Sequence, residues 1–279
     1  MNPLLLRQRL QSFLMEDVGT GDLSSQWIYP SVDAAVGYFL AKQDGMICGQ
    51  TIAQAAYDLL GHAVYEPLIG EGQKVTAGTR IGRASGEVRT LLTAERVILN
   101  LMQRMSGIAT QTSEAVRLLA DPTIKITDTR KTVPGLRLFD KYAVTVGGGH
   151  NHRIGLYDGV MLKDNHIAAS GGITAAVRTI RTHLGPMVKI EVETETEAEV
   201  REAVAAGADV IMFDNQAPAT IRSWRRLVPA AIATEASGGI TRRSLPHYTG
   251  CGVDYLSLGY LTNAAIPLDI SFDLERSKS

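Results

Sequence analysis

Apolar residues in the second half of the chain recur in short runs that are separated by helical stretches. The last four centres lie 21, 21 and 23 residues apart, which is the length of a strand, a helix and two short loops. Such units wind right-handedly on a parallel sheet. The pattern therefore predicts an α/β fold whose sheet is either a barrel or open and doubly wound. The apolar runs centre near Ile126, Met161, Ile190, Ile211, Ile232 and Tyr255.

The first half of the chain has a different pattern. Apolar residues at helical spacing after Pro3 predict a short amphipathic helix, and glycine-punctuated apolar runs over residues 36–92 predict a small β-rich unit. A second helix is expected to begin at a Thr93 cap and to stop at Gly107. On this helix Arg104 falls on the polar side, where the pattern alone indicates a solvated surface residue.

Polar residues follow every one of the six apolar runs. A barrel gathers all its strand ends around one mouth, whereas an open sheet collects ligand groups mainly at a switch point. The distribution favours a barrel. Because the repeats span only about 150 residues against roughly 250 in a typical eight-unit barrel, the barrel should be incomplete. The residues are, in order of the runs, Asp128 with Arg130, Lys163, Glu193, Asp214, Ser237 to Gly239, and Ser257 with Gly259.

Two of these positions leave alternatives open. Alternation puts Lys189, Glu191 and Glu193 on one strand face, which is typical of a solvated edge strand or of a site. Asp214 closes an apolar run, where a helix cap and a metal or hydroxyl ligand are both possible.

Histidines at positions 150, 152 and 166 lack the spacing of a metal site. Residues i and i+2 point apart on a helix, and no carboxylate motif accompanies them. Hydrogen-bonding or anion-contacting histidines are the favoured interpretation.

Composition limits the partners of this 279-residue chain, whose length suits two domains. A formal net charge of −1 argues against nucleic-acid or anionic-membrane surfaces, and no apolar run approaches the roughly 20 residues that span a bilayer. The two cysteines, Cys48 and Cys251, form no framework for disulfides or zinc. A cytoplasmic protein is expected.

Charge is nevertheless concentrated locally. Five possible cationic donors fall within 34 residues, interrupted by glycines and a proline, which indicates an anion site. Acidic residues follow the middle strands and glycines the late ones. The combination suits a ligand with several negative groups, a Mg²⁺ ion and a centre that becomes positive during reaction. The donors are Arg130, Lys131, His152, Arg153 and Lys163.

Several motifs resemble the quinolinate phosphoribosyltransferase family, in order and over nearly the whole chain. They include TDTRKTVPGLR from Thr127, KYAVTVGGGHNHRIGL from Lys141, MLKDNH from Met161, IEVET, IMFDN, EASGGI and LDISFDLE. The resemblance implies that quinolinate and phosphoribosyl pyrophosphate are converted, with Mg²⁺, to nicotinate mononucleotide, pyrophosphate and CO₂. It also implies a homodimer with shared active sites, or a hexamer of such dimers.

The resemblance further implies an architecture and residue roles. Residues 1–112 would form an α/β sandwich, 113–268 an irregular, incomplete TIM-like barrel, and 269–279 a segment that returns to the first domain. Arg104 would enter the site of the partner chain. Substrate carboxylates would be held by Arg130, His152, Arg153 and Lys163 with Lys131 beside them; Glu193 and Asp214 would face ribose, pyrophosphate and Mg²⁺; Ser237, Gly238, Gly239, Ser257 and Gly259 would contact phosphate; and Lys131, Lys163, Glu193 and Asp214 would be the catalytic group.

The chain also departs from the family pattern. Asp140 stands where glutamate is common, and Thr262, Asn263 and Ala264 stand where the family often has THS. Neither departure is expected to touch a residue assigned above. A homologous enzyme for another anionic ring acid and a non-catalytic anion-binding protein are the alternatives, while the KDNH motif argues against the related molybdenum-transport-associated group.

Overall fold

The structure is a computed structural model and describes residues 1–30 and 32–275. Two compact units are present, each described here by itself. The first comprises residues 1–111, 138–147 and the chain from 265 onward, and the second comprises 112–137 and 148–264. Residues 138–147 therefore belong to the first unit, although the predicted barrel of 113–268 included them.

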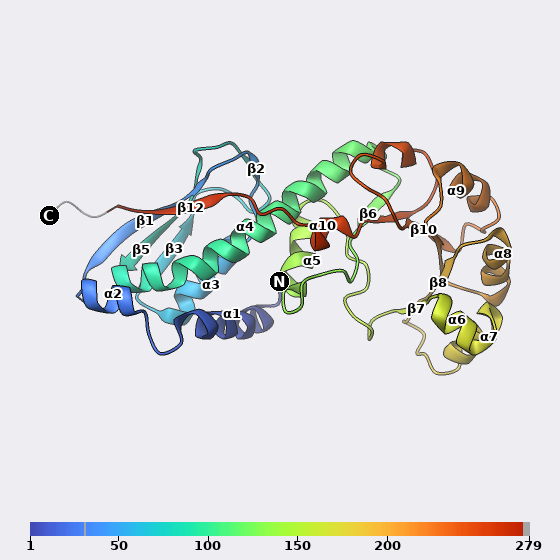
Figure 1. Cartoon of the computed structure of the whole chain (residues 1–279), viewed down its shortest axis with the longest axis horizontal. Helices are drawn as coiled ribbons and strands as arrows, with labels where there is room; N and C mark the ends of the chain where they lie inside the picture. Colours follow the sequence, from blue (N-terminus) through green and yellow to red (C-terminus); the bar gives the residue numbers. More distant parts are fainter. Residues whose placement is uncertain (31, 276–279) are drawn as a thin grey trace. The chain divides into compact units, whose positions relative to one another are not determined.

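The first unit is built on a four-stranded antiparallel sheet in the order β12-β1-β5-β3 (Figure 1). Strand β12 comes from the end of the chain and pairs with β1, so that Phe272 lies opposite Phe39. Residues 276–279 of the predicted returning segment lie outside the described residues. The strands are β1 (Ala34–Ala41), β3 (Ala63–Pro67), β5 (Arg80–Glu87) and β12 (Ile270–Glu275), with a small pair β2 (Gly45–Met46) and β4 (Lys74–Val75).

Helices complete the first unit: α1 (Pro3–Val18), α2 (Leu23–Ile28), α3 (Gln50–Leu60) and α5 (Arg137–Val146). Helix α3 interrupts the region that was expected to be β-rich. Helix α5 belongs here because the fully buried Phe139 packs against Phe13, with 5.9 Å between ring centroids. Inside the sheet, Phe39 lies 4.7 Å from Phe272 and 5.7 Å from Tyr65 between centroids, which ties the last strand to the core.

Helix α4 (Val88–Leu119) is longer than the pattern predicted. Thr93 does not cap it; its hydroxyl donates to Asp22 Oδ2 at 3.1 Å. Gly107 does not stop it either. A Cβ at Gly107 would lie 2.0 Å from the Ile266 carbonyl oxygen, so this glycine admits a close-packed backbone rather than ending the helix.

The second unit contains six parallel strands in the order β6-β11-β10-β9-β8-β7. Each predicted apolar run corresponds to one strand, although Ile232 precedes its strand by one residue. The strands are β6 (Lys125–Thr127), β7 (Val160–Leu162), β8 (Ile190–Thr194), β9 (Val210–Asp214), β10 (Ala233–Ser237) and β11 (Tyr255–Ser257).

Six helical segments of the described chain lie wholly within the second unit. They are α6 (Asp164–Ser170), α7 (Ile173–Arg181), α8 (Glu197–Ala206), α9 (Pro218–Arg225), the short η1 (Leu245–Tyr248) and α10 (Tyr260–Asn263). In Figure 1, α7, α8 and α9 lie along the outer side of this sheet, and α6 follows β7. Strand β8 lies between β7 and β9, so the interpretation of its charged face as a solvated edge strand is wrong. Within the described chain, no helix is both long and apolar enough to cross a bilayer.

Candidate active site

A cavity of about 470 Å³ opens at the carboxyl ends of the six strands. Every strand or the loop that follows it contributes to the lining, as in the mouth of a barrel. Eleven of the predicted residues line it: Arg130, Lys131, His152, Arg153, Lys163, Glu193, Asp214, Ser237, Gly238, Gly239 and Ser257. Thr129, Met161, Met212, Asn215 and Glu235 line it as well and were not predicted.

Two guanidinium groups form the cationic side of the cavity. Burial, and then the positive charge of nearby Arg130, lower the pKa of Arg153. Arg153 Nη1 donates to the Gly159 carbonyl at 3.0 Å, which directs the group. A bound anion would offset the electrostatic repulsion between these two cations. This side of the cavity therefore favours an anionic ligand.

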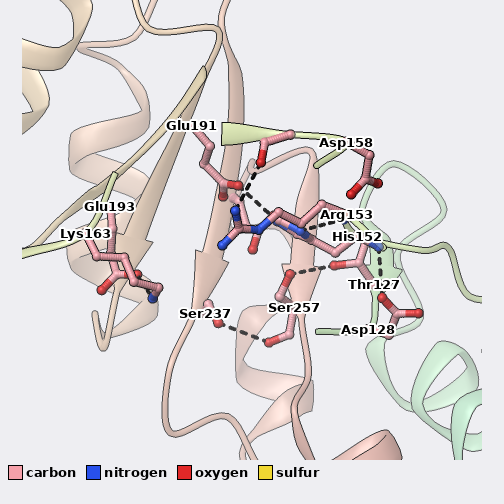
Figure 2. A network of polar contacts seen from close by, with 12 residues as sticks. Thr127, Asp128, His152, Arg153, Asp158, Lys163, Glu191, Glu193, Ser237 and Ser257 are labelled. Carbon is pink, nitrogen blue, oxygen red and sulfur yellow. Dashed lines mark hydrogen bonds and ion pairs between the residues drawn. The ribbon is translucent and has the colours of Figure 1, made fainter. Parts of the chain in front are cut away.

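Lys163 and Glu193 form an ion pair across the ends of β7 and β8 (Figure 2). The Lys163 side chain is 45% exposed and that of Glu193 12% exposed, so the pair faces the open cavity. The main chain of Lys163 is fixed, because its N–H donates to His166 Nδ1 at 3.1 Å at the start of α6. His166 therefore caps a helix.

Asp214 ends β9, two residues beyond Met212, which pairs with Glu193 on the neighbouring strand. The cap interpretation of Asp214 is wrong, because the N-cap of α9 is Ala217. Instead, Asn215 Nδ2 donates to Asp214 Oδ2 at 2.6 Å. The carboxylate is thereby oriented at the rim of the cavity and remains half-buried.

The loop after β10 brings backbone close to the cavity. Gly238 has a φ of +87°, and a Cβ there would lie 2.4 Å from Asn215 Oδ1. Only glycine meets both demands. Ser237 Oγ donates to the Ser257 carbonyl at 3.4 Å, and Ser257 Oγ lies 2.6 Å from Thr127 Oγ1, which links three strand ends (Figure 2).

Gly259 does not line the cavity but supports a residue that does. A Cβ at Gly259 would lie 3.0 Å from Lys131 Cδ. The next turn supports Lys131 as well, because Thr262 Oγ1 donates to its carbonyl at 2.9 Å. The expectation that the segment from Thr262 to Ala264 touches no assigned residue is therefore wrong.

Arg104 lies in the first unit and is not among the residues that line the cavity. Its Nε and Nη2 donate to the two carboxylate oxygens of Asp140, each at 2.8 Å. The Asp140 side chain is 0% exposed and that of Arg104 17% exposed. Arg104 is thus no solvated surface residue, and Asp140, which was expected to touch no assigned residue, holds it in a bidentate ion pair.

Two buried glutamates, Glu191 and Glu235, were not predicted as site residues; Glu235 lines the cavity and Glu191 does not. Glu191 Oε2 and Glu235 Oε2 lie 3.0 and 3.4 Å from His152 Nε2 (Figure 2 labels Glu191 and His152). For Glu191 the signal was the alternation that puts it on the same strand face as Glu193. For Glu235 the signal was a single charged residue inside the otherwise uncharged strand ATEAS.

The state of His152 decides what this cluster can do. Burial lowers its pKa, but the hydrogen bonds to Glu191 and Glu235 outweigh this and raise the pKa to about 10. The Arg153 N–H, however, points at Nδ1 at 2.8 Å, which requires an unprotonated acceptor and hence a neutral ring. We favour the neutral ring on this geometry. In either state the Nε2 proton faces the two carboxylates.

The three side chains His152, Glu191 and Glu235 are close enough together to hold a metal ion. A metal at Nε2 needs the lone pair of that nitrogen, whereas here Nε2 carries the proton. The arrangement therefore suits hydrogen bonding. The carboxylates of Glu193 and Asp214, which open onto the cavity, are the better oxygen donors for a hard cation.

Comparison with known proteins identifies the family. The model of the quinolinate phosphoribosyl transferase C-terminal domain matches residues 108–273, and that of the N-terminal domain matches residues 22–106. A probable nicotinate-nucleotide pyrophosphorylase (carboxylating) of Bacillus subtilis is 53% identical over 280 residues, covering 99% of this chain and 96% of the relative.

A second curated relative and a solved structure agree. The probable nicotinate-nucleotide pyrophosphorylase (carboxylating) of Synechocystis is 42% identical over 272 residues, covering 96% of this chain and 92% of the relative. The crystal structure of NadC from Streptococcus pyogenes superimposes with a TM-score of 0.95 at 38% identity, covering 100% of this chain and 99% of that one.

Proposed function

Since the chain belongs to the quinolinate phosphoribosyl transferase family, we propose that it transfers the phosphoribosyl group of phosphoribosyl pyrophosphate to quinolinate at the mouth of its parallel sheet. The chain is an enzyme, a pentosyltransferase of NAD biosynthesis. The products are nicotinate mononucleotide, pyrophosphate and CO₂. One observation carries the placement of the chemistry: a single cavity collects cations, carboxylates and glycine backbone from all six strand ends.

The cationic side of the cavity receives the two carboxylates of quinolinate. Arg130 and Arg153 supply guanidinium forks that match carboxylate geometry, and their mutual repulsion is relieved when the dianion binds. His152 and Lys131 lie along the same wall.

Lys163 is occupied by Glu193 in this structure. A substrate carboxylate that approaches Lys163 replaces the Glu193 carboxylate as the ion-pair partner of the ammonium group. The displaced Glu193 is free to turn to the ribose. Quinolinate binding thereby prepares the acidic side of the site for the second substrate.

The bonding changes follow from the two substrates. The lone pair of the quinolinate ring nitrogen forms the bond to C1 of the ribose, and the C1–O bond breaks with its electron pair leaving on pyrophosphate. C1 becomes positive as this bond breaks, and Glu193 and Asp214 stabilise that charge. The C2–carboxylate bond then breaks, its electron pair moves toward the ring that has become cationic, CO₂ leaves, and a proton from solvent replaces it at C2.

Mg²⁺ fits the donor chemistry of the same wall. Glu193 and Asp214 end neighbouring strands and offer carboxylate oxygens to the cavity, which are the ligands that this cation prefers. We propose that these two residues hold the ion, directly or through water. When bound, it neutralises charge on the leaving pyrophosphate.

We propose that the phosphate groups bind at the glycine-rich rim that follows β10, next to Asp214. Gly238 and Gly239 both have positive φ values, of +87° and +63°, and leave backbone groups uncovered by side chains. Ser237 adds a hydroxyl at the same rim. These groups bind phosphate without adding positive charge.

We also propose that the enzyme is a homodimer in which Arg104 completes the site of the partner chain. Two features support this: Arg104 is outside the cavity of its own second unit, and Asp140 fixes its guanidinium bidentately. Mixing Arg104→Ala chains with Lys163→Ala chains tests the idea. Each should be strongly impaired alone, and heterodimers should regain one intact site; if activity does not rise on mixing, the shared site is refuted.

A product assay tests the substrate assignment. The purified protein is incubated with phosphoribosyl pyrophosphate, Mg²⁺ and either quinolinate or nicotinate, and the nucleotide and ¹⁴CO₂ from 2-carboxyl-labelled quinolinate are measured. We expect stoichiometric nucleotide and CO₂ from quinolinate. Turnover of nicotinate alone would favour the second candidate, a transferase for another ring acid, and binding of both without turnover would favour an anion-binding protein.

The cytoplasm is the proposed location. Cys48 and Cys251 are both buried free thiols, as suits a reducing compartment. Fractionation of the cells that produce the protein, with activity assayed in each fraction, checks this placement.

A further inference from the structure

The loop from His150 to Gly159 carries two residues of the proposed quinolinate wall, His152 and Arg153, yet it has no regular secondary structure apart from one bridge at His150. A loop of this kind places side chains loosely unless other groups hold it. What holds this one is therefore part of how the site works. The backbone N–H of His152 is fixed by Asp128 Oδ1 at 2.9 Å.

The His152 ring is held from both of its nitrogens. Nε2 lies 3.0 Å from Glu191 Oε2 on β8 and 3.4 Å from Glu235 Oε2 on β10. Nδ1 accepts the backbone N–H of Arg153 at 2.8 Å. The imidazole thus connects two strands of the sheet to the peptide that begins Arg153.

Resting on the proposed function, we infer that Glu191 and Glu235 are positioning residues for quinolinate, which act by holding the His152 ring and through it the direction of Arg153. Glu191 is not among the residues that line the cavity, and Glu235, which lines it, has a side chain only 3% exposed. The backbone N–H of Arg153 is held by the His152 ring, and its guanidinium is held by the Gly159 carbonyl. Both ends of the Arg153 side chain are therefore fixed in position.

Burying these two carboxylates lowers the stability of the fold, which indicates that they are needed for binding rather than for folding. The Glu191 and Glu235 side chains are 7% and 3% exposed, and Oε1 of each has no hydrogen-bond partner among the described residues. Buried carboxylates with unmatched oxygens destabilise a fold, and apolar residues of similar size would stabilise it better. A pair that only supported the sheet would gain nothing from its charge.

Near-isosteric apolar variants separate the two roles. Glu191→Leu and Glu235→Leu remove the acceptors of the Nε2 proton and leave the space filled. We expect the KM for quinolinate to rise about 10-fold or more, the scale of one lost hydrogen bond to a charged group. The KM for phosphoribosyl pyrophosphate should stay within about 3-fold and the unfolding midpoint should not fall.

Conservative variants test the hydrogen bond itself. Glu191→Gln keeps an amide oxygen that accepts from Nε2, and we expect it to restore the quinolinate KM to within about 3-fold of the unsubstituted enzyme. Glu195→Leu is the matched control, because Glu195 follows the same strand with an exposed side chain. It should change neither KM.

A double-mutant cycle shows whether the glutamates act through His152. In a His152→Ala background, Glu191→Leu should add no further rise in the quinolinate KM, because the group that it positions is already gone. If Glu191→Leu does not fold, Glu191→Asp takes its place in the cycle, since it keeps the charge but withdraws the acceptor by about one carbon–carbon bond.

Several results would overturn the inference. These are an unchanged quinolinate KM in the Leu variants, equal rises in both KM values, Gln variants as impaired as Leu variants, or additive effects in the cycle. A stoichiometric divalent metal lost on Glu191→Leu would instead make the cluster a metal site. If the unsubstituted protein makes no nicotinate mononucleotide, the proposed function fails; if it does and the variants behave normally, only the inference fails.

Discussion

The ion pair between Arg104 and Asp140 gives a quantitative test of the structure. Both oxygens of a 0% exposed carboxylate accept from the guanidinium at 2.8 Å, and the Arg104 side chain is only 17% exposed. Replacing Asp140 by Ala leaves the guanidinium without this partner in a place that water reaches poorly. Breaking a buried pair in this way costs about 3–5 kcal/mol.

The residual exposure of Arg104 puts the expected loss near the lower end, at about 3 kcal/mol. The reverse change, Arg104→Met, leaves the completely buried Asp140 carboxylate without this partner and should cost more, near 5 kcal/mol. Removing both groups removes the stranded charge. The double variant Asp140→Ala/Arg104→Met should therefore be more stable than either single variant.

Unfolding in urea, followed by circular dichroism, measures these differences, and calorimetry should show the Asp140→Ala melting temperature lowered by about 6 °C or more. Glu66→Ala is the control, because Glu66 and Arg83 form an exposed pair at 3.5 Å with side chains 62% and 38% exposed; it should cost under about 1 kcal/mol. If Asp140→Ala costs no more than the control, or if the double variant shows the sum of both losses, the pair is not a buried anchor.

Three further predictions concern the cavity. Lys163→Ala should lower turnover about 100-fold, the scale of one positioned electrostatic group, in steady-state assays with both substrates saturating; near-normal turnover would remove Lys163 from the reaction. Gly238→Ala should raise the KM for phosphoribosyl pyrophosphate more than that for quinolinate, because its Cβ would lie 2.4 Å from Asn215 Oδ1, and isothermal titration with each substrate separates the two effects. Chelation of divalent ions should abolish turnover and added Mg²⁺ should restore it, whereas full activity in excess chelator would exclude Glu193 and Asp214 as holders of a required ion.

The α/β repeat was predictable because its signal is local. Each strand of the second unit lies at or next to a cluster of apolar residues and has a polar residue at its end or in the loop that follows. Parallel strands that are covered by helices favour such apolar clusters. Connection length then limits the topology. The sequence therefore predicted the parallel strands and eleven residues of one cavity without any knowledge of side-chain positions.

The errors arose where long-range packing decides. Gly107 carries the signal of a helix stop, but its lack of a Cβ serves contact with Ile266, a residue 159 positions later. Helix α5 follows a strand of the second unit and yet packs on Phe13 of the first. Periodicity describes one element at a time, so it cannot show which partner lies opposite.

The partners of charged residues were even harder to predict from the sequence. On α4 the pattern left Arg104 as surface, because an arginine on the polar side of a helix is usually solvated. Its buried partner, Asp140, comes from a separate helix, and neither residue alone carries a signal for the other. The role of Glu191 and Glu235 was not predictable for the same reason, because it depends on His152, which comes from a loop remote from both in sequence.

These two buried acidic groups share a physical logic. Each holds a cationic or proton-donating side chain in place by hydrogen bonds to fixed atoms, Asp140 with Arg104 and the glutamate pair with His152. A binding site for a dianion needs donors whose directions are set before the ligand arrives, because ordering them afterwards would weaken binding. Buried carboxylates that are already engaged by these donors provide that order, although Glu235 itself lines the cavity. Lys163 and Glu193 form the contrasting case, because here the carboxylate occupies the cation that the substrate would need. The displacement of Glu193 that we propose would couple binding of the first substrate to preparation of the site for the second.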